Sequence, residues 1–281
     1  MPDADYALVP PYSVLARGYD LIMEHVDYAD WADYVQGLIE KHAEGPVETI
    51  LELGCGTGAF AGQLQPQGPY RYTATDASEA MLERARELLD DGYAGNAPEH
   101  DGPDGDALDG QGAENTGEGR TGDDPITFAH LDFRDFHVDE KADVAILLYD
   151  GLNYLLDEDD VRRMFDAVHA ALRPGGLFVF DQSTPANSVN NAAYFEDEGE
   201  EDGFAYVRRS AYDPATRLHT TTFEIETEAG RFRENHVEKA YTLAEVRAFA
   251  SARFAVVAAY DAFTHAPATA ASERVHWVVR A

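Results

Sequence analysis

Residues 51–58 of this chain read Leu-Glu-Leu-Gly-Cys-Gly-Thr-Gly. They complete a short apolar run, residues 49–53, and lead into residues 59–64, whose pattern predicts a helix. A chain that passes directly from a strand into a helix needs backbone conformations that glycine adopts readily, and glycine also lets a ligand approach the backbone. The stretch therefore predicts the first strand, turn and helix of a parallel sheet, with a ligand bound at the turn.

The alternation of strand and helix continues beyond this turn. Asp157 is the expected N-cap of one later helix, and the sequence Arg-Pro-Gly-Gly at residues 173–176 ends it. This alternation predicts a Rossmann-like α/β fold in which a seven-stranded sheet has helices on both faces. The expected strands are residues 49–53, 71–75, 126–131, 144–149, 177–180, 255–260 and 274–280, and the helices after the first turn are expected near residues 59–64, 78–89, 158–172 and 242–250.

We expect four parts in the chain. Residues 1–45 contain two helical patterns and are predicted to lie over the ligand site, and residues 46–185 with 242–281 form the core. Residues 186–241 contain three strand-like runs separated by turn-forming segments, which predict a small antiparallel β lid on the substrate side. Residues 90–125 are rich in Gly, Asp, Glu and Asn and predict a disordered acidic insertion at the opposite edge of the sheet.

The composition is strongly acidic. The chain has 53 acidic residues and a formal net charge of −32, and lysine occurs only at positions 41, 141 and 239. Because the acids are scattered, we expect a surface adapted to concentrated salt, which screens its self-repulsion. No basic, aromatic-interleaved stretch favours a nucleic-acid partner, no apolar run is long enough to span a membrane, and the N-terminus is unlike a secretory signal. We therefore expect a halophilic, cytoplasmic protein, in which the single Cys55 excludes a disulfide framework.

Acidic side chains follow several predicted strands. Asp76 ends the strand after the glycine turn, where a carboxylate can accept hydrogen bonds from both hydroxyls of a ribose. Asp132 could accept from an adenine amino group, with Phe133 beside the ring, and Asp150 closes the next strand. Such an acidic rim suits a nucleoside with a cationic centre better than a diphosphate. Residues 54–59 still satisfy a dinucleotide fingerprint, so an NAD(P)-dependent oxidoreductase is the alternative.

Five segments resemble the successive motifs of class I S-adenosylmethionine-dependent methyltransferases. They are residues 51–58, 76–82 (Asp-Ala-Ser-Glu-Ala-Met-Leu), 132–136 (Asp-Phe-Arg-Asp-Phe), 149–155 (Tyr-Asp-Gly-Leu-Asn-Tyr-Leu) and 172–176 (Leu-Arg-Pro-Gly-Gly). More narrowly, residues 19–31 and 235–242 resemble the YqeM-like proteins and the aminosugar N-methyltransferases, which share a β-hairpin lid after the fifth strand. The resemblance covers nearly the whole chain outside residues 90–124.

The resemblance implies a binding site for S-adenosylmethionine. The glycines of the turn would line its methionine moiety, Asp76 its ribose, and Asp132 with Phe133 its adenine, near which Met81 would pack. Two tyrosines of the N-terminal helices would close over the cofactor, and two residues at the end of the fourth strand would lie beneath the sulfonium. The expected cofactor residues are Tyr12, Tyr19, Gly54, Cys55, Gly56, Gly58, Asp76, Ala77, Met81, Asp132, Phe133, Leu148 and Tyr149.

Methyl transfer asks little of side chains, because the sulfonium methyl is already activated and positioning the acceptor supplies most of the rate. A general base is needed only for an acceptor that is protonated near neutral pH. No Asn/Asp-Pro-Pro-aromatic turn follows the fourth strand and the only cysteine lies in the glycine turn, which argues against methylation of nucleic-acid bases. We expect transfer to an oxygen or nitrogen of a small-molecule acceptor without a metal; the other alternative is a homologue that binds the cofactor but is not catalytic. The candidate bases are Tyr154, His236, Glu238 and His219.

Overall fold

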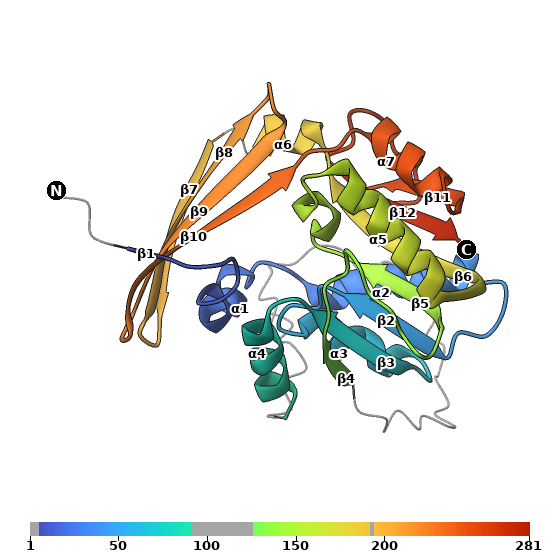
Figure 1. Ribbon diagram of the computed structural model, residues 1–281, viewed down its shortest axis with the longest axis horizontal. Helices are drawn as coiled ribbons and strands as arrows, with labels where there is room; N and C mark the ends of the chain where they lie inside the picture. Colours follow the sequence, from blue (N-terminus) through green and yellow to red (C-terminus); the bar gives the residue numbers. More distant parts are fainter. Residues whose placement is uncertain (1–5, 91–125, 192–193) are drawn as a thin grey trace, which may run out of the picture.

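The structure is a computed structural model, and it describes residues 6–90, 126–191 and 194–281. The strands in these residues form two sheets (Figure 1). The larger sheet has seven described strands in the order β11-β12-β6-β5-β2-β3-β4. The strands from β6 to β4 are parallel, whereas β12 is antiparallel to both β6 and β11. This arrangement confirms the predicted Rossmann-like sheet.

Strand β2, which lies between β5 and β3 inside this sheet, is buried along its whole length, as expected for a strand with neighbours on both sides and helices on both faces. The fifth strand along the core, β6, begins at Leu172 and not at residue 177, because Leu172 already pairs with Ala142. The strands are β2 (Thr49–Leu53), β3 (Arg71–Asp76), β4 (Thr127–His130), β5 (Ala142–Leu147), β6 (Leu172–Ser183), β11 (Ala255–Asp261) and β12 (Arg274–Arg280).

Helices cover both faces of the seven-stranded sheet (Figure 1). On one face Leu38 of α2 belongs to the same buried cluster as Phe60 of α3, and on the other Phe165 of α5 clusters with Val246 of α7. The side chain of Asp157 caps α5, as the sequence predicts. The helices of the core are α2 (Tyr28–His42), α3 (Ala59–Leu64), η2 (Gln65–Gln67), α4 (Glu79–Asp90), η3 (Gly151–Tyr154), α5 (Glu158–Ala171) and α7 (Leu243–Ser251).

The smaller sheet, which we call the lid sheet, has five described strands in the order β1-β10-β9-β8-β7. The sequence predicts β8, β9 and β10 but neither β1 nor β7. Strand β7 is rich in acids, which form strands poorly, but two of these acids pair with arginines of β8, Asp197 with Arg208 and Glu196 with Arg209. The strands of the lid sheet are β1 (Ala7–Leu8), β7 (Tyr194–Glu201), β8 (Phe204–Asp213), β9 (Leu218–Thr227) and β10 (Gly230–Lys239). The helix α6 (Pro185–Asn191) follows β6 and precedes β7.

The N-terminal segment connects the lid sheet to the core. Strand β1 runs parallel to β10. The chain then forms two short helices, η1 (Leu15–Gly18) and α1 (Tyr19–Ile22), where the sequence predicts a single helix. Leu15 and Ile22 form a buried cluster with Phe223 and other apolar residues of the lid sheet. In Figure 1 this segment passes beneath the lid sheet and next to α4.

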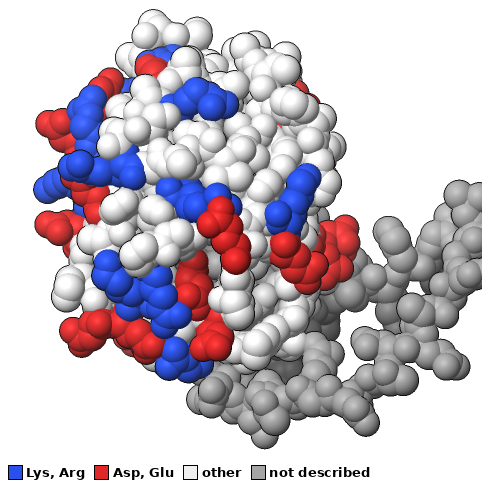
Figure 2. Space-filling model, turned by 90° about the vertical axis from the view of Figure 1, so that its right-hand side faces the viewer, with Lys and Arg blue, Asp and Glu red and all other residues white. Residues whose placement is uncertain are grey.

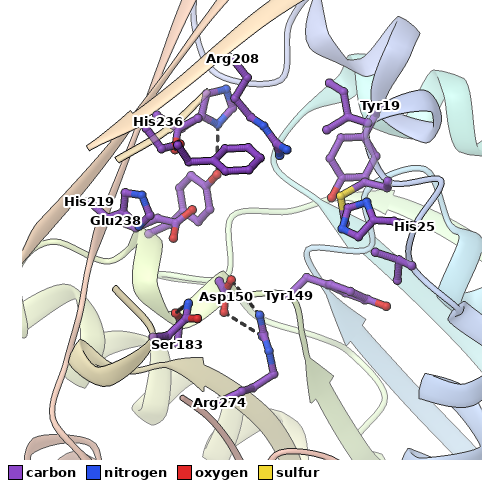
Figure 3. A pocket seen from close by; sticks show the side chains of 18 of the residues that line it. Tyr19, His25, Tyr149, Asp150, Ser183, Arg208, His219, His236, Glu238 and Arg274 are labelled. Carbon is purple, nitrogen blue, oxygen red and sulfur yellow. Dashed lines mark hydrogen bonds and ion pairs between the residues drawn. The ribbon is translucent and has the colours of Figure 1, made fainter. Parts of the chain in front are cut away.

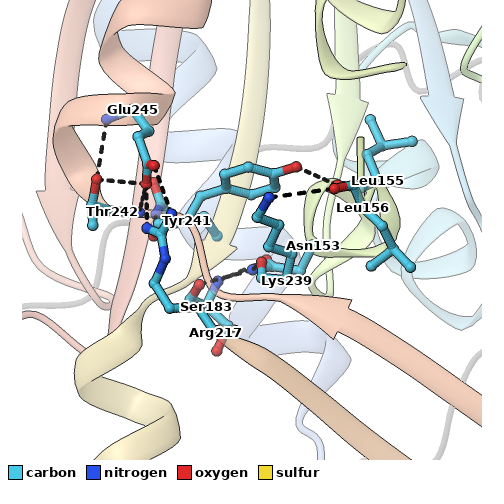
Figure 4. Close-up of polar contacts among 10 residues, drawn as sticks. Asn153, Leu155, Leu156, Ser183, Arg217, Lys239, Tyr241, Thr242 and Glu245 are labelled. Carbon is cyan, nitrogen blue, oxygen red and sulfur yellow. Dashed lines mark hydrogen bonds and ion pairs between the residues drawn. The ribbon is translucent and has the colours of Figure 1, made fainter. Parts of the chain in front are cut away.

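Buried polar contacts join the lid sheet to the core (Figure 4). The side chain of Asn153 donates to the carbonyl oxygens of Ser183 and Lys239 at 2.9 and 2.8 Å, and it accepts from the amide of Ser183 at 3.0 Å. Nearby, Tyr241 Oη donates to the carbonyl of Leu155 at 2.5 Å. Because Asn153 is buried, these bonds fix the direction in which β10 meets the core.

Charged side chains of both signs lie close together on one face of the molecule (Figure 2). Figure 2 shows one face, on which Lys and Arg side chains lie next to Asp and Glu side chains. In α5, for example, Arg162 pairs with Glu158 and Arg163 with Asp160. Within the described residues, no helix is both long enough and apolar enough to cross a membrane. The predicted insertion at residues 90–125 lies, apart from residue 90, outside the described residues.

Candidate active site

The turn after β2 has the backbone that its glycines predict. Gly54, Gly56 and Gly58 have φ angles of 68°, 55° and 76°, in the left-handed region that glycine favours. A Cβ added to Gly54 would lie 3.9 Å from the ring of Phe133, and one added to Gly56 would lie 3.8 Å from the ring of Tyr19. The turn is thus a bare stretch of backbone beneath two aromatic rings.

The carboxylate of Asp76 lies beside this turn, at the end of β3. Its Oδ2 accepts from the amide of Gly56 at 2.9 Å, and its Oδ1 accepts from the amide of Ser78 at 2.8 Å. Burial raises the pKa of Asp76, and these two amides oppose the rise. Each carboxylate oxygen has a further lone pair, so Asp76 can also accept from the hydroxyls of a ligand.

Asp132 follows β4 at the same edge of the sheet. Its side chain is 43% exposed and pairs with the guanidinium of Arg134, which holds the pKa of Asp132 below its usual range. An adenine amino group would therefore share this carboxylate with Arg134. Among the other residues assigned to the cofactor, Cys55, Met81 and Leu148 are buried, whereas Ala77 is exposed.

A cavity of about 960 Å³ lies between the core and the lid sheet (Figure 3). Its volume is within the range of cavities that hold small-molecule ligands. The glycines of the turn and Asp76 do not line it. The structure brings together in its wall the four candidate bases and three of the tyrosines assigned to the cofactor. These residues are Tyr12, Tyr19, Tyr149, Tyr154, His219, His236 and Glu238.

An ion cluster forms one end of the cavity. Arg274 donates to Asp150 at 2.8 Å and also pairs with Asp181, which is fully buried. Burial raises the pKa of Asp181 to about 7, and Arg274 opposes the rise. Burial would lower the pKa of Arg274, but the two carboxylates raise it above its usual value, so the guanidinium stays charged. Tyr149 and Asp150 have φ angles of 57° and 65°, which are rare for residues with side chains and mark a strained turn after β5.

Hydrogen bonds link the N-terminal segment to the lid sheet along the cavity wall. Tyr12 Oη lies 2.5 Å from Tyr154 Oη, and Tyr154 Oη lies 3.0 Å from His236 Nδ1. His236 Nε2 in turn lies 3.1 Å from the Oε2 of Glu234, a side chain without solvent exposure. Burial raises the pKa of both tyrosines, so their hydroxyls stay protonated.

His219 and Glu238 are directly opposite each other on β9 and β10, and both point into the cavity (Figure 3). Removal from water raises the pKa of Glu238 to about 8, and the charge of Asp150 adds to the rise. Burial lowers the pKa of His219, so its ring is neutral at pH 7. Its Nε2 and the Oη of Tyr149 are buried without a hydrogen-bond partner in the described part of the chain, as expected for groups that bind a ligand.

Three residues that complete this site are not among those predicted from the sequence. Trp31 lines the cavity, with its ring centroid 4.2 Å from that of Tyr149, and Arg274 neutralises the two acids described above. Arg274 lies in a segment where the sequence pattern predicts an ordinary strand. Two of the three had a signal in the sequence: Trp31 ends the segment 19–31 that carries the resemblance, and Glu234 shares a face of β10 with His236 at the strand period of two.

Residues 51–178 match the family model of a methyltransferase domain, which spans β2, the glycine turn, Asp76 and the start of β6. One relative is a protein from Geobacillus sp. (strain WCH70), which is provisionally named as a methyltransferase. It is 25% identical to this chain over 281 residues, which cover 96% of this chain and 99% of the relative.

Two solved structures share the fold. An S-adenosylmethionine-dependent methyltransferase from Clostridium acetobutylicum has a TM-score of 0.71 and 22% identity, covering 96% of this chain and 98% of the other. The sugar N-methyltransferase KedS8 from Streptoalloteichus has a TM-score of 0.66 and 18% identity, covering 100% of this chain and 97% of the other. The domain match and the Geobacillus relative confirm the predicted enzyme class, a methyltransferase, and the two solved structures confirm its fold.

Proposed function

We propose that this enzyme binds S-adenosylmethionine at the turn after β2 and transfers the methyl group to an amine nitrogen of a small polar molecule in the cavity. The observation on which the proposal rests is the lining of that cavity. Tyr12 and Tyr19, expected to cover the cofactor, share it with Glu238, whose carboxyl group can ionise beside a cationic acceptor. The donor site and the acceptor site are therefore adjacent.

The residues around the turn fit the cofactor. A Cβ at Gly54 or Gly56 would fill the space beneath the aromatic rings, so the bare backbone leaves room for the methionine moiety. Asp76 has lone pairs for the ribose hydroxyls, and the unpartnered Oη of Tyr149 lies in the wall of the adjoining cavity. When bound, S-adenosylmethionine supplies an electrophilic methyl group on a positively charged sulfur.

The cavity favours an amine over an alcohol. An ammonium group beside Glu238 lowers the pKa of that side chain, so that Glu238 ionises and attracts it, and aromatic faces such as that of Trp31 add a cation–π contribution. The unpartnered Nε2 of His219 can bind a hydroxyl of the same molecule. The structural similarity to a sugar N-methyltransferase supports an acceptor that has both kinds of group.

Each part of the chain has a role in this proposal. The N-terminal segment and the lid sheet exclude water from the cavity, with Tyr12 and Tyr19 against the cofactor. Tyr154, His236 and Glu238 hold the acceptor's amine and take the proton that an ammonium must lose before its lone pair is free. The residues of the core, 46–185 and 242–281, then serve mainly to bind the cofactor.

We also infer the setting in which the enzyme works. A net charge of −32 with three lysines supports a protein of the cytoplasm of a cell with high internal salt. In such a cell the acidic surface keeps the protein hydrated, while the repulsion between acids is screened.

The test is an assay with purified protein, S-adenosylmethionine and a panel of aminosugars, each paired with the sugar that has a hydroxyl in place of the amine. Formation of S-adenosylhomocysteine and the mass of the product report the transfer. We expect one or more amines to gain a methyl group on nitrogen while the matched alcohols do not. Methylation of the alcohols alone would contradict the proposed acceptor, and cofactor binding without any transfer would support the non-catalytic alternative.

A further inference from the structure

The carboxylate of Glu234 is buried and holds four N–H groups. Its Oε1 accepts from the amides of Val14 and Leu15 at 2.7 and 2.9 Å. Its Oε2 accepts from the amide of Tyr12 at 2.7 Å and from His236 Nε2 at 3.1 Å. Burial alone would raise the pKa of Glu234, but these hydrogen bonds hold it below its usual range. The side chain is therefore an ionised carboxylate inside the protein.

This arrangement sets the direction of the hydrogen bonds along the cavity wall. A carboxylate can only accept, so His236 must present a protonated Nε2 to Glu234. In the neutral imidazole the other nitrogen, Nδ1, is then an acceptor for the hydroxyl of Tyr154, and the carboxyl group of Glu238, which keeps its own proton, can donate to the same Tyr154 oxygen. The hydroxyl of Tyr12 in turn donates to the oxygen of Tyr154. Each proton thus points towards His236.

We propose that Glu234 is a positioning residue that fixes this tautomer of His236, so that His236 can receive the proton of Tyr154 while Tyr154 takes a proton from the acceptor. The proposal rests on the amine methylation proposed above. An ammonium N–H bond breaks as an O–H bond forms on Tyr154, and the former hydroxyl proton of Tyr154 moves to Nδ1. The resulting imidazolium is paired with Glu234. The amine lone pair then forms the new N–C bond as the C–S bond breaks with its electron pair on sulfur.

The variant Glu234→Gln tests this role with little change of shape. The amide oxygen of a glutamine would satisfy the amides of Val14 and Leu15, which leaves its NH₂ group at the place of Oε2, facing His236 Nε2. The amide of Tyr12 loses its acceptor in this variant, a cost to stability that Tm reports separately. That NH₂ group donates, so the imidazole would be driven to the tautomer with a bare Nε2 and a protonated Nδ1. Nδ1 would then donate to Tyr154 and could no longer receive its proton.

The first measurement is the nitrogen NMR spectrum of the histidine rings in the whole protein, which does not depend on activity. The signal of His236 is assigned from its loss in His236→Gln. We expect a protonated Nε2 and an unprotonated Nδ1 in the wild type, and the opposite pattern in Glu234→Gln. A wild-type Nδ1 that carries the proton, or an unchanged tautomer in the variant, would overturn the proposal even if no acceptor had been found.

The second measurement separates positioning from general stability. Tyr154→Phe removes the relay but leaves every hydrogen bond of Glu234 in place, so kcat on an amine should fall about 100-fold while the Kd for S-adenosylhomocysteine is unchanged. Glu234→Gln should show a similar fall in kcat at saturating substrates. Ser13→Ala is the control, because Ser13 Oγ lies 3.4 Å from Glu234 Oε1 and is outside the relay, so its kcat should match the wild type.

The outcomes are distinct. If Glu234→Gln weakens cofactor binding or lowers Tm but keeps its kcat within threefold of the wild type, Glu234 only anchors the N-terminal segment and the proposal is wrong. If the wild type methylates no amine, the proposed function fails, whereas the tautomer measurement still decides the role of Glu234.

Discussion

Ser78 Oγ donates a hydrogen bond of 2.9 Å to the carbonyl oxygen of Tyr12. The amide of Ser78 also holds the carboxylate of Asp76, and the hydroxyl of Tyr12 lies 2.5 Å from that of Tyr154. Tyr12 has a φ of 62°, a conformation that residues with side chains rarely adopt and that its surroundings must enforce. Tyr12 therefore lies between the expected ribose site and the acceptor cavity and contacts both.

Replacing Asp76 tests the ribose site. Asp76→Ala should weaken the binding of S-adenosylhomocysteine by about 1.5–3 kcal/mol, because charge-assisted hydrogen bonds to the ribose are lost. Calorimetric titration of the folded variant measures the change. Asp139→Ala is the control, since Asp139 is exposed and precedes β5, at the opposite edge of the sheet from Asp76, so this variant should bind like the wild type. Equal affinity for the Asp76 variant and this control would show that the carboxylate does not contact the cofactor.

The backbone of the glycine turn can be tested by its effect on stability. Gly58→Ala should lower the free energy of unfolding by about 1–2 kcal/mol, because φ is 76° and the new Cβ would lie 3.3 Å from the Cβ of Ala85. Gly37→Ala is the matched control, because Gly37 lies in α2 with nothing within 4 Å of an added Cβ. That variant should be unchanged or more stable by up to about 1 kcal/mol. Urea denaturation measures both, and equal effects would contradict the assigned turn.

A buried acid of β2 predicts how stability depends on pH. Burial raises the pKa of Glu52 from 4.5 to about 8, although Tyr72 donates a hydrogen bond to it. The folded protein thus binds a proton that the unfolded chain releases above pH 4.5. Stability therefore falls as the pH rises from 4.5 to about 8, by at most about 1.4 kcal/mol for each pH unit in that interval.

Glu52→Gln is neutral at every pH and should lack this contribution. Urea denaturation at about pH 6 and about pH 9 should therefore show that the variant gains stability relative to the wild type at the higher pH. Glu48→Gln, at an exposed position just before the same strand, should show no such difference. If the difference in free energy of unfolding between Glu52→Gln and the wild type is the same at both pH values, Glu52 is charged in the folded protein at both. The raised pKa of Glu52 would then be wrong.

The surface charge predicts a response to salt. With a net charge of −32, repulsion between acids opposes folding, and salt shortens its range from about 10 Å at about 0.1 M to about 3 Å at about 1 M. Surface ion pairs such as that of Arg162 with Glu158 weaken under the same conditions but contribute little each. Tm should therefore rise between about 0.1 M and about 2 M KCl. An unchanged or lower Tm at high salt would contradict adaptation to a saline cytoplasm.

The sequence predicts those parts of the fold that depend on residues close together in the chain. The strand before Gly54, the turn and Asp76 follow from local pattern, and Asp157 caps its helix as expected. Strand β1 could not be predicted, because its two residues pair with Phe232 and Arg233, far along the chain. Strand β7 was missed since its acids form strands poorly without the arginines of β8.

In the candidate site, too, local features could be predicted from the sequence and contacts between distant residues could not. The period of two placed Glu234, His236 and Glu238 on one face of β10, but only the fold shows what that face meets. The amides that Glu234 holds belong to residues 12–15, and the hydroxyl that His236 meets belongs to Tyr154. Such contacts depend on tertiary packing, which a single sequence does not reveal.

The central claim is that a sulfonium nucleoside, and not a dinucleotide, binds beside Gly56 and Asp76. Calorimetric titration of the wild-type protein with S-adenosylhomocysteine and, separately, with NADH tests it most directly. We predict saturable binding of S-adenosylhomocysteine, one per chain, and none of NADH. Binding of NADH with no binding of S-adenosylhomocysteine would contradict the account.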